Sequence, residues 1–251
     1  MSRRLLVIGA HSADFVWRAG GTIAVTTAAG GVAQVLALSY GERGESGELW
    51  KKEGMTVERV KEVRREEAEG AAAHLGASFE SLDLGDYPLI VDRDGLSAIA
   101  AKIREFSPDV LLTHTDRDPF NPDHAEAFFA VEKARALAAG AGTASAFGGP
   151  FNPPELLLFE PHQPELCNFT PTVFVDITPV IEQKRAAMAE MQAQSHLRTY
   201  YEELAARQPR APLVRERRSR VRRGLPARHA AGGRRPVTFS TVPGTVKGQQ
   251  P

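Results

Sequence analysis

The sequence predicts an α/β protein with a three-layer, Rossmann-like fold, in which helices flank both faces of a mostly parallel sheet. Short apolar runs without polar alternation, such as residues 5–8 and 110–112, are typical of parallel strands that are buried on both faces. Longer segments between such runs carry apolar residues at helical spacing. Strand and helix therefore alternate along the chain as they do in βαβ units, which give a parallel sheet.

The individual elements follow from the same periodicities. Small residues over 20–29 predict a helix that can approach the sheet closely, and a second strand follows at 33–38. Apolar residues recur at helical spacing from Val57 to Leu75 with charged residues between them, so a long amphipathic helix is expected there. The same reasoning predicts strands at 79–84, 110–113, 156–159 and 173–176, and helices at 96–106, 123–137 and 178–194.

The composition is that of a globular protein with one full core. At 251 residues the chain is long enough for a single α/β domain, which we expect to span residues 1–207. Positive and negative side chains balance, so we expect neither a nucleic acid nor a membrane as partner. The single Cys167 excludes an intramolecular disulfide, and no signal-peptide pattern or bilayer-length apolar run is present. We therefore expect a soluble, cytoplasmic protein.

Residues 208–251 differ in character from the rest of the chain. From residue 209 onward there are ten arginines and one lysine against a single acid, Glu216, with many prolines and glycines and no sustained apolar period. Three interpretations stay open. The first is a frameshift product, since GC-rich DNA read out of frame yields Arg- and Pro-rich sequence. The second is a genuine basic tail, and the third is a disordered segment.

Histidine and aspartate side chains follow two of the predicted strands. His11 and Asp14 lie directly after the first strand, and His124 lies beyond the strand at 110–113. The carboxyl ends of parallel strands meet at one edge of the sheet, where ligands of open α/β sheets bind. Two imidazoles and a carboxylate suit a zinc ion, although iron, manganese and cobalt also accept this set. The sequence therefore predicts a metal site formed by His11, Asp14 and His124.

The surroundings of these residues resemble the PIG-L/LmbE family of zinc-dependent de-N-acetylases, whose motifs read Ala-His-Pro-Asp-Asp-Glu and His-Pro-Asp-His. The resemblance implies the fold of that family and the same three metal ligands, His11, Asp14 and His124. The family's general base is the first aspartate of the first motif, and Ala13 stands at that position. A methyl group accepts no proton, whereas a general base supplies about 10²–10⁴-fold in rate. Metal binding is therefore expected here, but ordinary amide hydrolysis is not.

Longer stretches resemble a narrower group, the 4-oxalomesaconate (4-carboxy-2-hydroxymuconate) hydratases of bacterial gallate and protocatechuate 4,5-cleavage pathways. These stretches are residues 10–21, 41–46 and 159–165, and the resemblance extends over about residues 4–207. It implies a zinc-dependent hydro-lyase that adds water to 4-carboxy-2-hydroxymuconate or its keto tautomer, giving 4-carboxy-4-hydroxy-2-oxoadipate. It also implies a small polycarboxylate substrate and a homo-oligomer, with a hexamer as one candidate.

Hydration requires a base for water and a group that delivers a proton to carbon. The glycine-rich segment 41–48 follows the second predicted strand, so it is expected at the metal edge of the sheet. Its acids are the candidates for the base, with Glu45 first and Glu42 and Glu48 as alternatives. His162 is the candidate that donates or relays the second proton, because histidine titrates near neutral pH.

Substrate carboxylates require matching donors, and arginine supplies two parallel hydrogen bonds. Arg43 in the glycine-rich segment and Arg18 just after the first motif are the expected substrate-binding arginines. Asn121 and Asp123 are expected to contribute to the same site by orienting water or His124.

Two rival functions stay open beside the hydratase. The first is a zinc-dependent de-N-acetylase of the PIG-L/LmbE type that uses a relocated base. The second is a catalytically inactive scaffold that has kept the metal-binding fold. Their substrates distinguish them, because the first releases acetate from N-acetylated sugars and the second turns over nothing.

Overall fold

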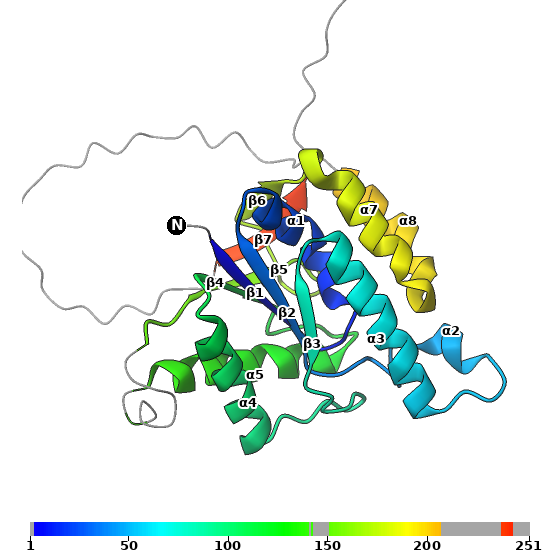
Figure 1. Ribbon diagram of the computed structural model, residues 1–251, viewed down its shortest axis with the longest axis horizontal. Helices are drawn as coiled ribbons and strands as arrows, with labels where there is room; N and C mark the ends of the chain where they lie inside the picture. The colour runs from blue at the N-terminus through cyan, green and yellow to red at the C-terminus, as the bar shows by residue number, and fades with distance from the viewer. Residues whose placement is uncertain (1–2, 141, 143–150, 207–236, 243–251) are drawn as a thin grey trace, which may run out of the picture.

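The computed structural model describes residues 3–140, 142, 151–206 and 237–242, and it confirms the predicted α/β fold. The strands are β1 (Arg4–Gly9), β2 (Val32–Ala37), β3 (Ser78–Ser81), β4 (Val110–Thr113), β5 (Glu155–Phe159), β6 (Val173–Asp176) and β7 (Val237–Val242). Among the described residues they form one sheet in the order β3-β2-β1-β4-β5-β7-β6, and all neighbouring strands are parallel (Figure 1).

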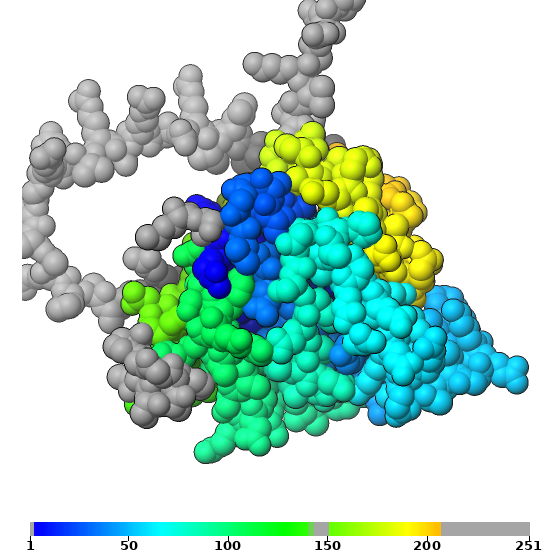
Figure 2. Space-filling view, viewed as in Figure 1, coloured from blue at the N-terminus to red at the C-terminus, as the bar shows by residue number. Residues whose placement is uncertain are grey.

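Helices cover both faces of this sheet. The helices are α1 (Gly20–Ala28), α2 (Gly47–Trp50), α3 (Val57–His74), α4 (Arg93–Phe106), α5 (Pro122–Ala139), α7 (Ile181–Glu190) and α8 (Arg198–Ala206). Helices α4 and α5 lie on one face, while α1, α3, α7 and α8 lie on the other (Figure 1). Figure 2 shows α3 in direct contact with α7. In the described part of the chain, no helix is long and apolar enough to cross a membrane.

Strand β1 contributes to both hydrophobic cores. Leu5 and Val7 pack toward α1, α3 and α7, whereas Leu6 and Ile8 pack toward α4 and α5. Each of these four side chains is at most 4% exposed. A strand that is covered on both faces requires apolar residues at every position, which explains the uninterrupted apolar run in its sequence.

Besides α2, α8 and β7, which the sequence analysis did not predict, three segments differ from the prediction. Residues Phe15–Ala19 form a π-helix (η1) before α1 begins. Strand β3 ends at Ser81, three residues before the predicted end at 84. The helix predicted over 178–194 is divided into η3 (Thr178–Val180), α7 and η4 (Gln192–Leu197), because Met191 has non-helical dihedral angles.

Strand β7 lies within the unusual segment 208–251. It is inserted between β5 and β6 and runs parallel to both. Residues 207–236 and 243–251 lie outside the described part of the chain. The frameshift, basic-tail and disorder interpretations of this segment, and the domain boundary at 207, therefore stay predictions.

Strand β1 lies at the point where the order of the strands across the sheet reverses. Strands β2 and β3 extend from one side of β1, and β4 and β5 extend from the other. In open α/β sheets the ligand binds outside the carboxyl ends of the strands at this switch point. The connections that follow β1, β2 and β4 converge there, and they carry His11, Glu45 and His124.

A buried ion pair joins α3 to the connections around this edge. Arg64 is fully buried and donates from Nη1 to Glu67 at 2.9 Å. Its Nε donates to the carbonyl of Tyr40 just after β2, and its Nη2 donates to Oε1 of Gln194 in η4, both at 3.3 Å. Glu67 in turn accepts a hydrogen bond from the amide of Ala193 at 2.8 Å. Arg64 therefore holds three chain segments together.

We expect Arg64→Met to lower the free energy of unfolding by about 3–5 kcal/mol, because it leaves the carboxylate of Glu67 buried without its partner. The matched control is Arg65→Met, which removes a solvent-exposed pair with Glu69 on the same helix and is expected to cost far less, because water screens that pair. Urea denaturation of both variants measures the difference. Equal losses of stability would contradict the structural role of Arg64.

Candidate metal centre

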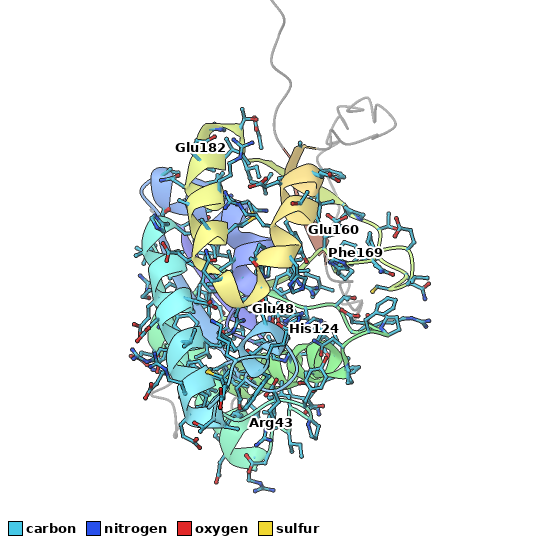
Figure 3. The ribbon with its side chains drawn as sticks, turned by 90° about the vertical axis from the view of Figure 1, so that its right-hand side faces the viewer. Arg43, Glu48, His124, Glu160, Phe169 and Glu182 are labelled. Atoms are coloured by element: carbon cyan, nitrogen blue, oxygen red, sulfur yellow. The ribbon has the colours of Figure 1, made fainter. Side chains whose placement is uncertain are left out.

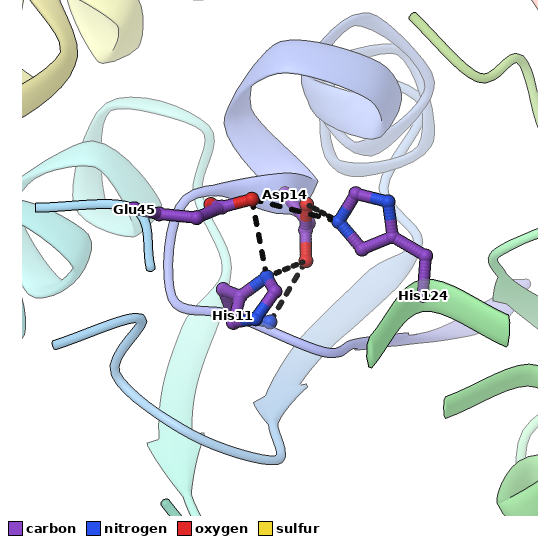
Figure 4. Close-up of side chains that lie close together, drawn as sticks. All are labelled: His11, Asp14, Glu45 and His124. Carbon is purple, nitrogen blue, oxygen red and sulfur yellow. Dashed lines mark hydrogen bonds and ion pairs between the residues drawn. The ribbon is translucent and has the colours of Figure 1, made fainter. Parts of the chain in front are cut away.

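Four side chains that could bind a metal ion meet at the switch point of the sheet. They are His11, Asp14, Glu45 and His124, and one ligand atom from each lies within 4.8 Å of the others. Nδ1 of His11 is 3.2 Å from Oε1 of Glu45, and Nε2 of His124 is 3.4 Å from Oδ1 of Asp14 (Figure 4). The centroids of the two imidazole rings are 5.4 Å apart. The structure thus brings together the three residues that the sequence assigns to the metal.

The local structure at two strand ends positions these ligands. His11 and Asp14 lie in the turn between β1 and η1, where the amide of His11 donates to Oδ2 of Asp14 at 2.8 Å. The Asp14 side chain makes no capping hydrogen bond to the helix that follows. His124 lies in the first turn of α5, which is started by Pro122 and capped by Asn121.

Glu45 reaches the cluster because Gly41 allows the loop after β2 to approach His11. Gly41 has a φ of +71°, and a Cβ at this position would lie 3.1 Å from Cβ of His11 and 3.3 Å from Cβ of Glu45. Any other residue would be strained here both by its backbone conformation and by this contact. The loop is also held by Asp86, whose carboxylate accepts hydrogen bonds from two of its amides.

The hydrogen bonds of the two imidazoles fit a metal ion at this position. Asp123 lies 3.2 Å from Nε2 of His11, and Asp118 lies 2.8 Å from Nδ1 of His124. The other ring nitrogens, Nδ1 of His11 and Nε2 of His124, are buried and make no hydrogen bond of acceptable geometry with the described residues. Metal-bound histidines typically donate their second N–H to a carboxylate in this way. Both rings are therefore oriented to offer a nitrogen to one cation.

The electrostatics of the cluster also favour a cation. Burial raises the pKa of the Glu45 carboxyl, but the facing His11 imidazole brings it well below its usual range. Burial and the charge of Arg18 lower the pKa of His124, but the surrounding carboxylates raise it to about 9. The carboxylates thus stay ionised near neutral pH, and they stabilise positive charge between them.

A pocket of about 200 Å³ opens beside the cluster. Its lining includes Glu45, Arg18, Asn121 and His162, four residues that the sequence assigns to catalysis or substrate binding. The side chain of Arg18 is 8% exposed, and its Nε lies 3.8 Å from Oδ1 of Asp14. Burial and the charge of Arg18 lower the pKa of His162, so its ring is neutral near pH 7. The pocket therefore combines a cation, a carboxylate and a neutral imidazole.

The structure does not bring Glu42, Glu48 or Arg43 into this pocket. Glu48 is exposed and pairs with a neighbouring lysine at 2.6 Å. Glu42 is buried instead beside Lys61, with 3.7 Å between Oε1 and Nζ. The side chain of Arg43 is exposed, and Figure 3 shows it well away from His124. Successive side chains of this irregular loop point in different directions, so only part of it adjoins the metal cluster.

Asp123 lies behind His11 and does not line the pocket. Its carboxylate accepts hydrogen bonds from the amides of Tyr87 and Leu89 at 3.0 and 2.9 Å. The contact that it makes with the cluster is with His11, whereas the sequence suggested that it orients water or His124. The residue that orients His124 is Asp118.

The side chain of Ala13 packs in the hydrophobic core and does not line the pocket beside the metal cluster. It is fully buried and belongs to the hydrophobic core that includes Phe15 and Val16. The carboxylate of Glu45, which comes from a different loop, lies 3.2 Å from Nδ1 of His11 and 3.6 Å from Nε2 of His124.

Four residues of the site were not predicted from the sequence. His114 stacks on His124 with 4.1 Å between ring centroids, and its Nε2 lies 3.0 Å from Oδ2 of Asp14. His114 and Asp118 stand in an acidic stretch directly after β4, which is a usable signal. Gln194 and Tyr201 also line the pocket, but they come from the C-terminal helical region, where no local motif marks them.

Comparisons with known proteins agree with this geometry. The family model for GlcNAc-PI de-N-acetylases, PIG-L, matches residues 6–135. A curated 4-oxalmesaconate hydratase from Pseudomonas putida is 47% identical over 200 residues, which are 80% of this chain and 77% of the relative.

Solved structures show the same relationship. The crystal structure of GalB, the 4-carboxy-2-hydroxymuconate hydratase from Pseudomonas putida KT2440, matches with a TM-score of 0.78 and 46% identity, covering 81% of this chain and 84% of that chain. The N,N'-diacetylchitobiose deacetylase from Pyrococcus horikoshii matches with a TM-score of 0.69 and 22% identity over 81% of this chain and 77% of that one, a likeness of fold alone. By its sequence motifs, its fold and its relatives, the chain belongs to the PIG-L family.

Proposed function

We propose that the protein is a metal-dependent hydratase of aromatic catabolism. It adds water to 4-carboxy-2-hydroxymuconate or its tautomer 4-oxalomesaconate and yields 4-carboxy-4-hydroxy-2-oxoadipate. The observation that carries the proposal is that a carboxylate is missing at position 13 and that the carboxylate of Glu45 lies at the metal cluster. Ala13 stands in the core at the position of the family's hydrolytic base, while Glu45 reaches the metal cluster from another loop. The similarity to the two hydratases supports the same reaction.

We further propose zinc as the bound ion. His11, Asp14 and His124 would hold it, since three protein ligands with an open position are typical of catalytic zinc. When bound, zinc supplies a Lewis acid that polarises oxygen atoms of the substrate. Iron, manganese and cobalt accept the same ligands, so elemental analysis of the isolated protein is the direct test of the metal.

Glu45 and His162 are proposed as the two proton-transfer groups. Hydration places a hydroxyl group on one alkene carbon and a proton on its neighbour. Glu45 accepts a proton from the attacking water, because its carboxylate is ionised and Oε1 faces the metal ligands. His162 relays a proton to the neighbouring carbon, and its neutral ring can accept a proton before passing it on. The proton that His162 passes to carbon is the one that Glu45 has taken from water, so both groups end the cycle as they began and one water molecule is added.

Arg18 is proposed to bind a carboxylate of the substrate. Its guanidinium lines the pocket and is almost fully buried, and its 3.8 Å separation from Asp14 is too long for a hydrogen bond. Its donors are thus available to a polycarboxylate ligand. The homo-oligomeric assembly and the cytoplasmic location that the resemblance and the sequence suggest stay predictions.

The function is tested by offering both substrate classes to the purified protein. We expect loss of the conjugated absorbance of 4-carboxy-2-hydroxymuconate and no acetate from N-acetylglucosamine conjugates. A chelator should stop the reaction, and added zinc should restore it. Release of acetate would favour the de-N-acetylase with a relocated base. No turnover of either substrate by the metal-loaded protein would favour the inactive scaffold.

Replacement of the proposed base tests the role of Glu45. Glu45→Gln should lower kcat by about 10²–10⁴-fold, because the amide cannot accept the proton of water. The control is Glu42→Gln in the same loop, whose side chain is buried beside Lys61 and should leave kcat nearly unaltered. Metal content of both variants is measured alongside. An unaltered kcat in Glu45→Gln would remove this residue from the role.

A pair of arginine variants tests the substrate site. Arg18→Met should raise KM by about 10–100-fold, the effect of losing a charge-assisted hydrogen bond worth about 1.5–3 kcal/mol. Arg43→Met should leave KM unchanged, because this side chain is exposed outside the pocket. Steady-state kinetics with the muconate substrate measure both. The opposite pattern would favour the glycine-rich loop as the carboxylate site.

A further inference from the structure

Gln194 connects the C-terminal part of the chain to the proposed base. It lies in η4 and is only 6% exposed. Its Nε2 donates to Oε2 of Glu45 at 3.2 Å. Its Oε1 accepts hydrogen bonds from Nε1 of Trp17 at 3.1 Å and from Nη2 of Arg64 at 3.3 Å. A neutral side chain thus bridges two buried donors and the carboxylate beside the metal ligands.

The orientation of this amide follows from the chemistry of its neighbours. Indole and guanidinium nitrogens only donate hydrogen bonds, so the atom of Gln194 that faces Trp17 and Arg64 must be the oxygen. The NH₂ group must then face the ionised carboxylate of Glu45, which only accepts. Both ends of the amide are therefore satisfied in one orientation, and the flipped orientation would oppose donor to donor and acceptor to acceptor.

Asn121 holds the other oxygen of the same carboxylate. Its Oδ1 accepts from the amide of Asp123, which leaves Nδ2 to donate to Oε1 of Glu45 at 3.0 Å. Glu45 is thus held by one amide on each oxygen, from the start of α5 on one side and from η4 on the other. Neutral amides can fix a carboxylate without the charge that an arginine or a lysine would bring, so its negative charge remains available to a proton.

We infer that Gln194 is a positioning residue for Glu45, and this inference rests on the proposed hydratase function. It fixes the carboxylate so that Oε1 faces the nitrogens of His11 and His124, 3.2 and 3.6 Å away. Arg64 and Trp17 hold Gln194 from behind. The interruption of the helix at Met191 is what places Gln194 at this point, because an uninterrupted α7 would direct the following residues elsewhere.

The test is the near-isosteric variant Gln194→Glu, in which carboxylate oxygens can still accept from Trp17 and Arg64 but the hydrogen bond to Oε2 of Glu45 is lost. We expect kcat to fall by about 10–100-fold, the usual effect of removing such a supporting hydrogen bond, with little change in KM. Gln192→Glu is the matched control, since Gln192 lies in the same element but is exposed. Its kcat should equal that of the unaltered chain.

A double-mutant cycle separates positioning from a general structural effect. If Gln194 acts through Glu45, Gln194→Glu should lower kcat no further in a Glu45→Gln background. Thermal unfolding of each variant reports the stability, and Gln194→Met replaces Gln194→Glu in the cycle if the added charge prevents folding. An unaltered kcat, or an equal loss in both backgrounds, would overturn the inference. Absence of turnover by the unaltered chain would instead overturn the proposed function.

Discussion

The site depends on two carboxylates that lie behind the imidazoles. Asp123 fixes His11 and Asp118 fixes His124, and both carboxylates come from the segment that follows β4. His11 follows β1, so its contact with Asp123 crosses the switch point of the sheet. Asp123 also accepts hydrogen bonds from the backbone amides of Tyr87 and Leu89, in the loop beyond β3. Such contacts are strong because water is excluded from them. The geometry of the cluster is therefore set by the strand order and does not depend on the metal alone.

The same arrangement couples metal binding to the stability of the fold. Asp14, Glu45, Asp118 and Asp123 lie close together around two imidazoles, and burial of so many carboxylates is costly without compensating positive charge. In the metal-free protein, protons on the imidazoles supply this charge, as the raised pKa of His124 indicates. A divalent cation replaces those protons. Ligand binding to the folded state alone stabilises it, so a metal bound at this cluster would also stabilise the fold.

The parts of the site that are local in sequence could be predicted, and the parts set by tertiary packing could not. His11 and Asp14 follow one buried strand and His124 follows another, so periodicity and the rule for parallel sheets were sufficient. The resemblance favoured an acid in the glycine-rich segment but did not decide between Glu45, Glu42 and Glu48, since no period fixes side-chain directions in an irregular loop. Gln194 lies far along the chain in a short 3-10 segment, and its role depends on contacts across 149 positions.

The position of the carboxylate, on the loop of Glu45 and not at position 13, suggests how one fold can serve both amide hydrolysis and hydration. The proposed metal ligands lie in the turn after β1 and in the first turn of α5. A base next to the ligands in sequence, at position 13, is confined to one direction of approach. A base on the loop after β2 can be placed independently, because Gly41, Asn121 and Gln194 fix its direction. With Glu45 as the proposed base, the carboxylate on a separate loop would serve a different substrate atom from one at position 13, while the proposed metal ligands are the same.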